Sequence, residues 1–229
     1  MKLQTAALAC LLALVVSTPP LQADGKGHYR GRAVYEVTIT NVTRAQIFTP
    51  FLVVAHRPGV RLFEVGHPAS AELEALAEFG DTVPFEDALA VTPGVHGITV
   101  GGGPLAPGKT TTMKVEGHRY DRVSLAAMLI PTNDAFIALD SAGPFGRGLK
   151  STFAPAYDAG TEVNDELCES IPGPPYAECE PDGPGGGSPA DGAEGFVRIH
   201  EGIQGIGDFL GGSRDWRNPV AKVSIRRIR

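Results

Sequence analysis

The sequence lacks the excess of basic residues that binding to nucleic acid requires. Its 229 residues include 20 Lys and Arg against 26 Asp and Glu, which gives a formal net charge of -6. Non-specific binding to phosphates depends on clustered positive charge, so this balance argues against a nucleic-acid partner. Beyond the N-terminus no second apolar stretch reaches the length of about 20 residues that a membrane span needs, and we expect none in the mature chain.

Familiar catalytic patterns are also missing. The chain contains no HExxH, GxSxG or GxGxxG motif and no P-loop lysine, and it has no EF-hand pattern. No two of its histidines stand at metal-ligand spacing, so we expect them on the surface or packed within strands: His28, His56, His67, His96, His118 and His200. We assign no catalytic residue and expect that the protein is not an enzyme. Its many carboxylates leave a glycosidase-like acid pair open.

Glycine and proline are abundant, with 29 and 19 residues. They favour many turns and few long helices, as an all-β fold requires. Alternating or β-branched segments predict about eight strands, which we group as an antiparallel two-sheet β-sandwich. The expected strands cover residues 33–42, 48–55, 94–100, 109–115, 122–130, 135–139, 196–200 and 220–228.

One helical insertion interrupts the predicted strands. Ser70 can cap a helix over residues 70–79, where leucine and alanine recur at helical spacing, and Gly80 ends it. Residues 85–90 predict a further helical turn. By contrast, residues 141–194 are dominated by acidic and turn-forming residues, and we expect a long Gly/Pro-rich acidic loop there.

The N-terminus has the pattern of a secretory signal peptide. A basic start precedes an apolar run over residues 6–16, and small residues then lead to a cleavage site after Ala23. The run is too short for a membrane anchor. A lipoprotein signal at Cys10 is the weaker alternative, because this cysteine lies inside the apolar core. We predict a signal peptide over residues 1–23, a flexible segment over residues 24–32 and one domain over residues 33–229, in a secreted or periplasmic protein.

Removal of the signal peptide leaves two cysteines, Cys168 and Cys179. An even pair in an oxidising compartment predicts a disulfide, here closing a loop of about a dozen residues. Such a bridge stabilises a fold by roughly 2–3 kcal/mol in the chain-entropy model. Without further Cys or His ligands nearby, the pair is a poor zinc site.

Acidic residues gather between positions 134 and 182. Carboxylates on adjacent loops repel each other unless a cation neutralises them, and Ca²⁺ takes six to eight oxygen ligands of this kind. From composition alone, a solvated acidic loop remains the alternative to a calcium site.

Four segments resemble a known family, the spondin N-terminal domain. Residues 131–136 (PTNDAF) resemble its PSPDWF-type segment, and residues 157–162 (YDAGTE) resemble its WDAGTD segment. Residues 215–223 (DWRNPVAKV) are similar to its closing RNPVA strand. Residues 35–41 (YEVTITN), followed by Phe51, are similar to its opening strands.

The resemblance spans roughly residues 33–228 and implies a C2-like β-sandwich with one bound Ca²⁺ ion. By motif, the calcium carboxylates are Asp134, Asp158 and Glu162, with Asp165 and Glu166 as outside candidates. The family further implies an adhesion or interaction module whose partner is an unknown protein or glycan at the cell surface or matrix. A carbohydrate- or small-ligand-binding protein is the alternative, and a calcium-assisted hydrolase is a third reading.

Overall fold

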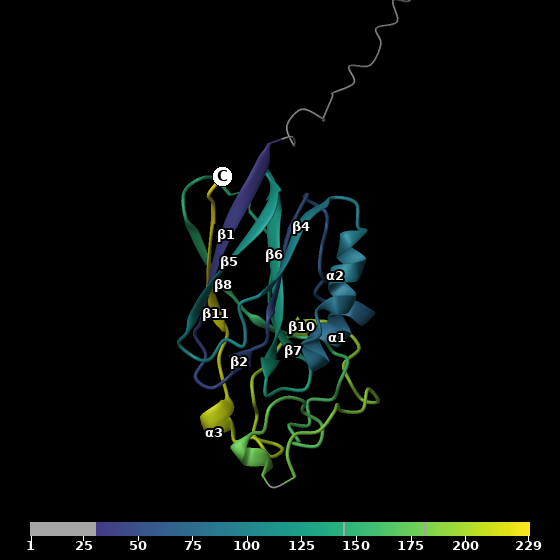
Figure 1. The fold of residues 1–229 in the computed structure, drawn as a ribbon. Coiled ribbons are helices and arrows are strands. Elements are labelled where there is room, and N and C mark those ends of the chain that lie inside the picture. The colour runs from purple at the N-terminus through teal and green to yellow at the C-terminus, as the bar shows by residue number, and fades with distance from the viewer. Residues whose placement is uncertain (1–30, 144, 181) are drawn as a thin grey trace, which may run out of the picture.

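The computed structural model describes residues 31–143, 145–180 and 182–229. The predicted signal peptide and nearly all of the predicted flexible segment lie outside these residues. Within them the expected all-β sandwich is confirmed, with two antiparallel sheets (Figure 1). None of the helices in the described ranges combines the length and the apolar character that crossing a membrane would take.

The smaller sheet has four strands in the order β5-β1-β11-β8. Its strands are β1 (Arg32–Asn41), β5 (Thr110–His118), β8 (Lys150–Ala154) and β11 (Ala221–Arg227). In β1 every second residue is buried, so Tyr35, Val37 and Ile39 point to the core while the residues between them reach the surface. The last strand of the chain, β11, therefore lies between β1 and β8 in the interior of this sheet.

The larger sheet follows the order β10-β9-β7-β6-β3-β4, and β2 pairs with β6. Its strands are β2 (Ile47–Phe48), β3 (Phe51–His56), β4 (Val95–Gly101), β6 (Arg122–Ile130), β7 (Ala135–Ala142), β9 (Ala156–Asp158) and β10 (Arg198–Ile199). All six residues of β3 are buried, so neither face of this strand is exposed to solvent. It is covered on both sides, by the other sheet and by two helices.

Helices α1 (Ala71–Phe79) and α2 (Val83–Ala90) form the predicted helical insertion and cover the outer face of the larger sheet (Figure 1). Ser70 caps α1 by accepting a hydrogen bond from the Leu73 amide, and Gly80 ends it in a left-handed conformation, as predicted. The expected turn at residues 85–90 is a complete helix. Leu73 and Leu76 belong to the same buried cluster as Leu52 of β3, which forms a second core outside the one between the sheets.

Three expectations need correction. Residues 48–55 form two strands, β2 and β3, where one was expected, because Pro50 interrupts them. Residues 141–194 are not loop alone, since they contain β8 and β9. The described residues hold eleven strands, several of only two or three residues, where about eight were expected.

The strand registers define two ends of the sandwich. We call residues 131–134, 159–180 and 182–219 the loop end; they include the 3-10 turn η1 (Ala177–Cys179) and helix α3 (Gly211–Arg214). The predicted disulfide is confirmed there, since Cys168 is bonded to Cys179. We call the turn at residues 117–121, with the neighbouring starts of β1 and β4 and the C-terminal end of β11, the hairpin end. Strand β6 runs from the hairpin end to the loop end.

Candidate functional site

The sandwich brings the three predicted calcium ligands to the loop end. Asp134 directly precedes β7, Asp158 ends β9, and the register of these strands pairs Asp158 with Ala135. Glu162 follows four residues after Asp158. Asp134 Oδ2 accepts hydrogen bonds from the Glu162 amide at 3.2 Å and the Thr161 amide at 2.8 Å. The two segments that the family motifs single out are therefore in direct contact.

Asp134 is fully buried. Burial raises the pKa of its carboxyl group, while the two amide donors oppose this increase. Its second oxygen, Oδ1, is buried without a hydrogen-bond partner. Leaving a buried acceptor unpaired costs about 1–3 kcal/mol, and more for a charged group. This oxygen is therefore suited to a ligand that brings positive charge.

In Glu162, as in Asp134, one carboxylate oxygen is hydrogen-bonded and the other is not. Its Oε1 accepts a hydrogen bond from the Ser188 amide at 2.7 Å, and its Oε2 is buried without a partner. Burial is the main cause that raises the pKa of this carboxyl group to about 8, and the nearby charges of Glu78, Asp134 and Asp165 add to it. Near neutral pH the folded protein therefore resists ionisation of Glu162 unless a cation compensates it.

Asp158 differs, because an arginine already compensates its charge. Its Oδ2 lies 3.0 Å from the Arg198 guanidinium and accepts a hydrogen bond from Asn164, while Oδ1 accepts one from the Gly160 amide at 2.7 Å. Burial, followed by the charge of Asp134, raises its pKa to about 7, and Arg198 opposes this shift. Asp158 Oδ1 keeps a free lone pair, but Oδ2 is fully engaged.

The three carboxylates do not form the tightest cluster of possible metal ligands. Across residues 31–143, 145–180 and 182–229, only His96, His118 and Asp121 place one ligand atom each within 4.8 Å of one another. In the described structure, the carboxylate oxygens of Asp134, Asp158 and Glu162 thus do not all come within 4.8 Å of one another. The donor chemistry of Asp134 and Glu162 fits a hard cation, while Arg198 holds part of the third carboxylate.

Sequence reasoning missed Glu78, in the last turn of α1. Only 8% of this residue is exposed, and burial raises the pKa of its carboxyl group, helped by the charges of Glu74 and Asp134. Its side chain is hydrogen-bonded with Thr161, beside the other carboxylates. The signal was an anion in the last turn of a helix, where the helix dipole disfavours negative charge.

The outside candidates hold the loop end together. The Asp165 carboxylate accepts hydrogen bonds from Asn133, Ser170 and Ser188, and these bonds, with one from the Leu167 amide, outweigh burial and lower its pKa. The Glu166 carboxylate accepts from three consecutive amides at residues 204–206. Both carboxylates are thus occupied within the protein.

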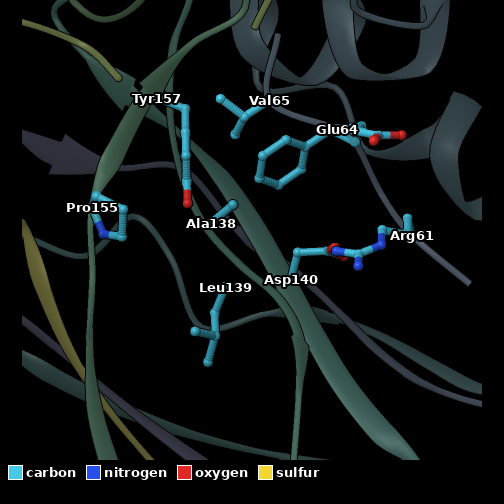
Figure 2. A pocket seen from close by; sticks show the side chains of 9 residues that line it. Arg61, Glu64, Val65, Ala138, Leu139, Asp140, Pro155 and Tyr157 are labelled. Carbon is cyan, nitrogen blue, oxygen red and sulfur yellow. The ribbon is translucent and has the colours of Figure 1, made fainter. Parts of the chain in front are cut away.

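A shallow cavity of about 410 Å³ lies on the larger sheet near α1. Tyr157 packs against Phe136 and Phe63 on one side, and the Arg61–Asp140 ion pair, at 2.9 Å, borders the other. Figure 2 shows the Tyr157 hydroxyl group pointing into the space beside Ala138. The cavity therefore combines an aromatic surface with polar groups.

Comparison with known proteins supports one family. The family model described as Spondin_N matches residues 40–143. The match includes Asp134 but ends before Asp158 and Glu162, which rest on the motif at residues 157–162. No curated protein matches the chain. The family recognised from short motifs is confirmed: over residues 40–143, this chain is similar to the spondin N-terminal domain.

Proposed function

We propose that this protein is an exported, non-catalytic interaction module whose loop end is ordered by a calcium ion. The spondin N-terminal family suggests an extracellular module of the adhesion type. The calcium ion and the partner, an unknown protein or glycan at the cell surface or matrix, are our inference beyond that.

One observation carries the proposal. Asp134 Oδ1 and Glu162 Oε2 are buried carboxylate oxygens without hydrogen-bond partners. They come from segments that contact each other, and the buried carboxylate of Glu78 lies close by. Because Ca²⁺ is bound by carboxylates, carbonyls and water, it would neutralise this cluster and satisfy both oxygens.

Asp134 and Glu162 would be direct ligands. Asp158 would join them through Oδ1, since Oδ2 is held by Arg198 and Asn164. Ca²⁺ would thereby connect the start of β7 to the loop that follows β9. The surface of the loop end would then be ordered enough to bind a partner, which is the role we assign to the ion.

Thermal unfolding in Ca²⁺ and in chelator tests the proposal. A ligand bound only by the folded state raises the melting temperature, so Ca²⁺ should stabilise the wild type. Asp134→Asn and Glu162→Gln should each abolish most of this shift, and Asp158→Ala should weaken it. Asp87→Asn changes an exposed residue of α2 and is the matched control. Identical melting curves of the wild type in both conditions would disprove the calcium site.

The cavity beside Tyr157 favours a second candidate function, the binding of a carbohydrate or another small ligand. Ligand sites commonly join aromatic surface to a few placed polar groups, and Tyr157 and the Arg61–Asp140 pair supply both. A glycan array probed with wild type and Tyr157→Ala should then give hits that the variant loses. An array without hits would leave the interaction module as the better account.

A further inference from the structure

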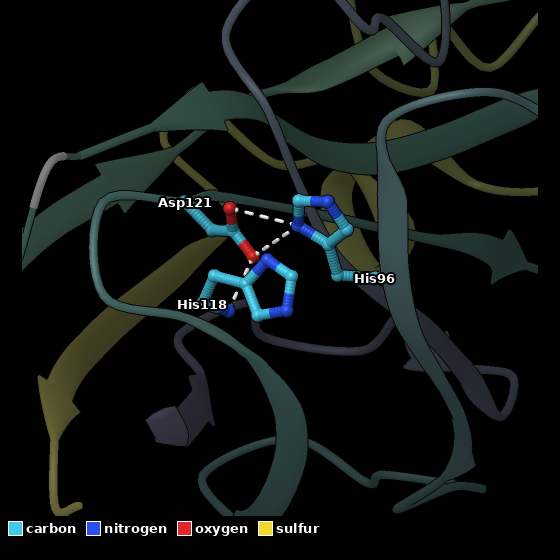
Figure 3. Close-up of side chains that lie close together, drawn as sticks. All are labelled: His96, His118 and Asp121. Atoms are coloured by element: carbon cyan, nitrogen blue, oxygen red, sulfur yellow. Dashed lines mark hydrogen bonds and ion pairs between the residues drawn. The ribbon is translucent and has the colours of Figure 1, made fainter. Parts of the chain in front are cut away.

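Two histidines and an aspartate meet at the hairpin end, opposite the proposed calcium site. His96 lies in β4, His118 ends β5, and Asp121 directly precedes β6. Figure 3 shows the two rings and the carboxylate facing one another. One ligand atom from each residue lies within 4.8 Å of the others, although 22 positions separate the histidines in the sequence.

A strand irregularity directs His96 to this cluster. In the pairing of β3 with β4, Ala55 lies opposite Gly97 and His56 lies opposite Val95, so His96 is an extra residue in a β-bulge. Bulges re-aim a side chain and occur often beside functional sites. The position of His96 is thus set by the register of the larger sheet.

Gly97 brings His96 close to the other sheet. A Cβ atom at position 97 would lie 1.9 Å from the carbonyl oxygen of Glu116 in β5, so only glycine permits this approach of β4 to β5. Glu116 precedes His118 by two residues. The close contact of the sheets therefore places the two histidine rings together, with centroids 3.9 Å apart.

Asp121 is the fixed centre of the group. It is fully buried, and its Oδ2 accepts hydrogen bonds from the His118 amide at 2.7 Å and from His96 Nδ1 at 2.8 Å. The amide bond holds the carboxylate against the turn at residues 117–121. Because a backbone amide determines its orientation, the Asp121 carboxylate is preorganised to bind a group located between the two histidine rings.

His118 carries an unsatisfied nitrogen. Its Nδ1 is buried and has no hydrogen-bond partner. His56 lies opposite the bulge on β3, but both of its ring nitrogens are already engaged, with Ser124 Oγ at 2.7 Å and the carbonyl group of Arg57 at 2.8 Å. His118 Nδ1, His96 and Asp121 therefore form the group that could bind a further ligand.

We propose that His96, His118 and Asp121 bind a divalent transition-metal ion of the Zn²⁺ class. Imidazole nitrogens favour zinc, copper, nickel and iron, whereas Ca²⁺ prefers oxygen ligands. The metal would replace the His96–Asp121 hydrogen bonds and give His118 Nδ1 a partner. Three protein ligands leave a position for water or for a side chain of a binding partner. The competing account is a plain His–Asp ion pair that binds no metal.

Calorimetric titration of Zn²⁺ into the full exported chain, saturated with Ca²⁺, tests this site. We expect one Zn²⁺ ion to bind, and His96→Asn or His118→Asn to weaken binding at least about 10-fold, the size of loss seen when metal-site residues are altered. His67→Ala is the matched control, because the His67 side chain is 64% exposed and lies outside the cluster. It should bind Zn²⁺ like the wild type.

The visible absorption spectrum of bound Co²⁺ tests which residues coordinate the metal. Co²⁺ bound to the site should give visible absorption bands that disappear in the two asparagine variants and persist in His67→Ala. Absence of Zn²⁺ binding to the wild type, or equal binding by all variants, would overturn the proposal. Zinc binding that Glu162→Gln abolishes would also overturn it, since the ion would then lie at the loop end. Should His118→Asn unfold, His96→Asn decides the matter, because β4 is an edge strand.

Discussion

The two ends of the sandwich hold buried charge in opposite ways. At the loop end, carboxylates lie beside other carboxylates, and of the three proposed calcium ligands only Asp158 forms an ion pair with Arg198. At the hairpin end a single carboxylate, Asp121, lies between two histidines. The neighbouring surface is basic, with an open cavity of about 460 Å³ lined by Gly31 and by arginines 32, 119, 147, 227 and 229. One fold can therefore hold an oxygen-rich site and a nitrogen-rich site at its two ends.

The ends also differ in what positions their side chains. At the hairpin end, strand register and the contact at Gly97 place His96 and His118. At the loop end, long segments without regular structure are held by hydrogen bonds from backbone amides to the carboxylates of Asp165 and Glu166. We therefore expect the hairpin end to be rigid without a ligand and the loop end to depend on one.

Substitution of Gly97 should have the largest effect and should damage the hairpin end. Gly97→Ala would place its Cβ atom 1.9 Å from the Glu116 carbonyl oxygen, and such overpacking costs about 3 kcal/mol. Denaturant unfolding would measure the loss, and zinc binding should weaken with it. Gly148→Ala is the control, since a Cβ atom there meets nothing within 4 Å. Equal stability of the two variants would show that β4 and β5 are not as close as described.

Removal of the disulfide should damage the loop end instead. Cys168 and Cys179 are 11 residues apart, and opening a loop of this size costs about 3 kcal/mol in the chain-entropy model. In the double serine variant we expect a lower free energy of unfolding and weaker Ca²⁺ binding, measured by melting and calorimetry. Zinc binding should be unchanged. A parallel loss of zinc binding would contradict the independence of the ends.

The pH dependence of stability should come from the loop end. The pKa of Glu162 is raised from 4.5 to about 8 in the folded protein, so ionisation is easier in the unfolded chain. In chelator, the contribution of Glu162 to stability should therefore be largest below about pH 4.5 and be lost as the pH rises towards 8, a change of up to about 5 kcal/mol. Glu162→Gln should flatten this slope, and so should Ca²⁺. An unchanged slope in the variant would place the titration elsewhere.

The smallest expected effect is the coupling between the ends. Asp121 precedes and Asp134 follows β6, whose nine residues span roughly 30 Å. Distant sites act additively within about 0.5 kcal/mol, so stabilisation by Ca²⁺ and Zn²⁺ together should equal the sum of the two. A double-mutant cycle of Asp134→Asn and His96→Asn, followed by melting, measures this. A larger coupling would mean that the sandwich transmits a change along β6.

Local sequence signals were enough for the regular elements. The alternation in β1, the apolar run of β6 and the Ser70 and Gly80 caps of α1 all predict what the structure contains. Strands β8 and β9 were missed because they are short, lie among turn residues and owe their conformation to pairing with β11 and β7. This pairing depends on segments distant in the sequence, so no local sequence pattern predicts it.

For the candidate sites, too, local sequence patterns predicted some residues, and others depended on tertiary contacts. Asp134 and Glu162 were found because motifs around them resemble a family, and the structure places their segments in contact. Glu78, Arg198 and the histidine pair were missed, since each reaches its site from an element distant in sequence. Spacing along the chain cannot reveal that a bulge turns His96 towards His118.

The inner position of β11 has a consequence for biogenesis. Residues 35–41 of β1 pair with residues 221–227, which lie almost 190 positions later. During synthesis, β1 lacks its neighbour on that side until residues 221–227 have been made, and closing so long a loop is slow. A nascent chain of this protein would thus keep an unpaired strand edge until β11 is in place, and such an edge can pair with other chains and cause aggregation.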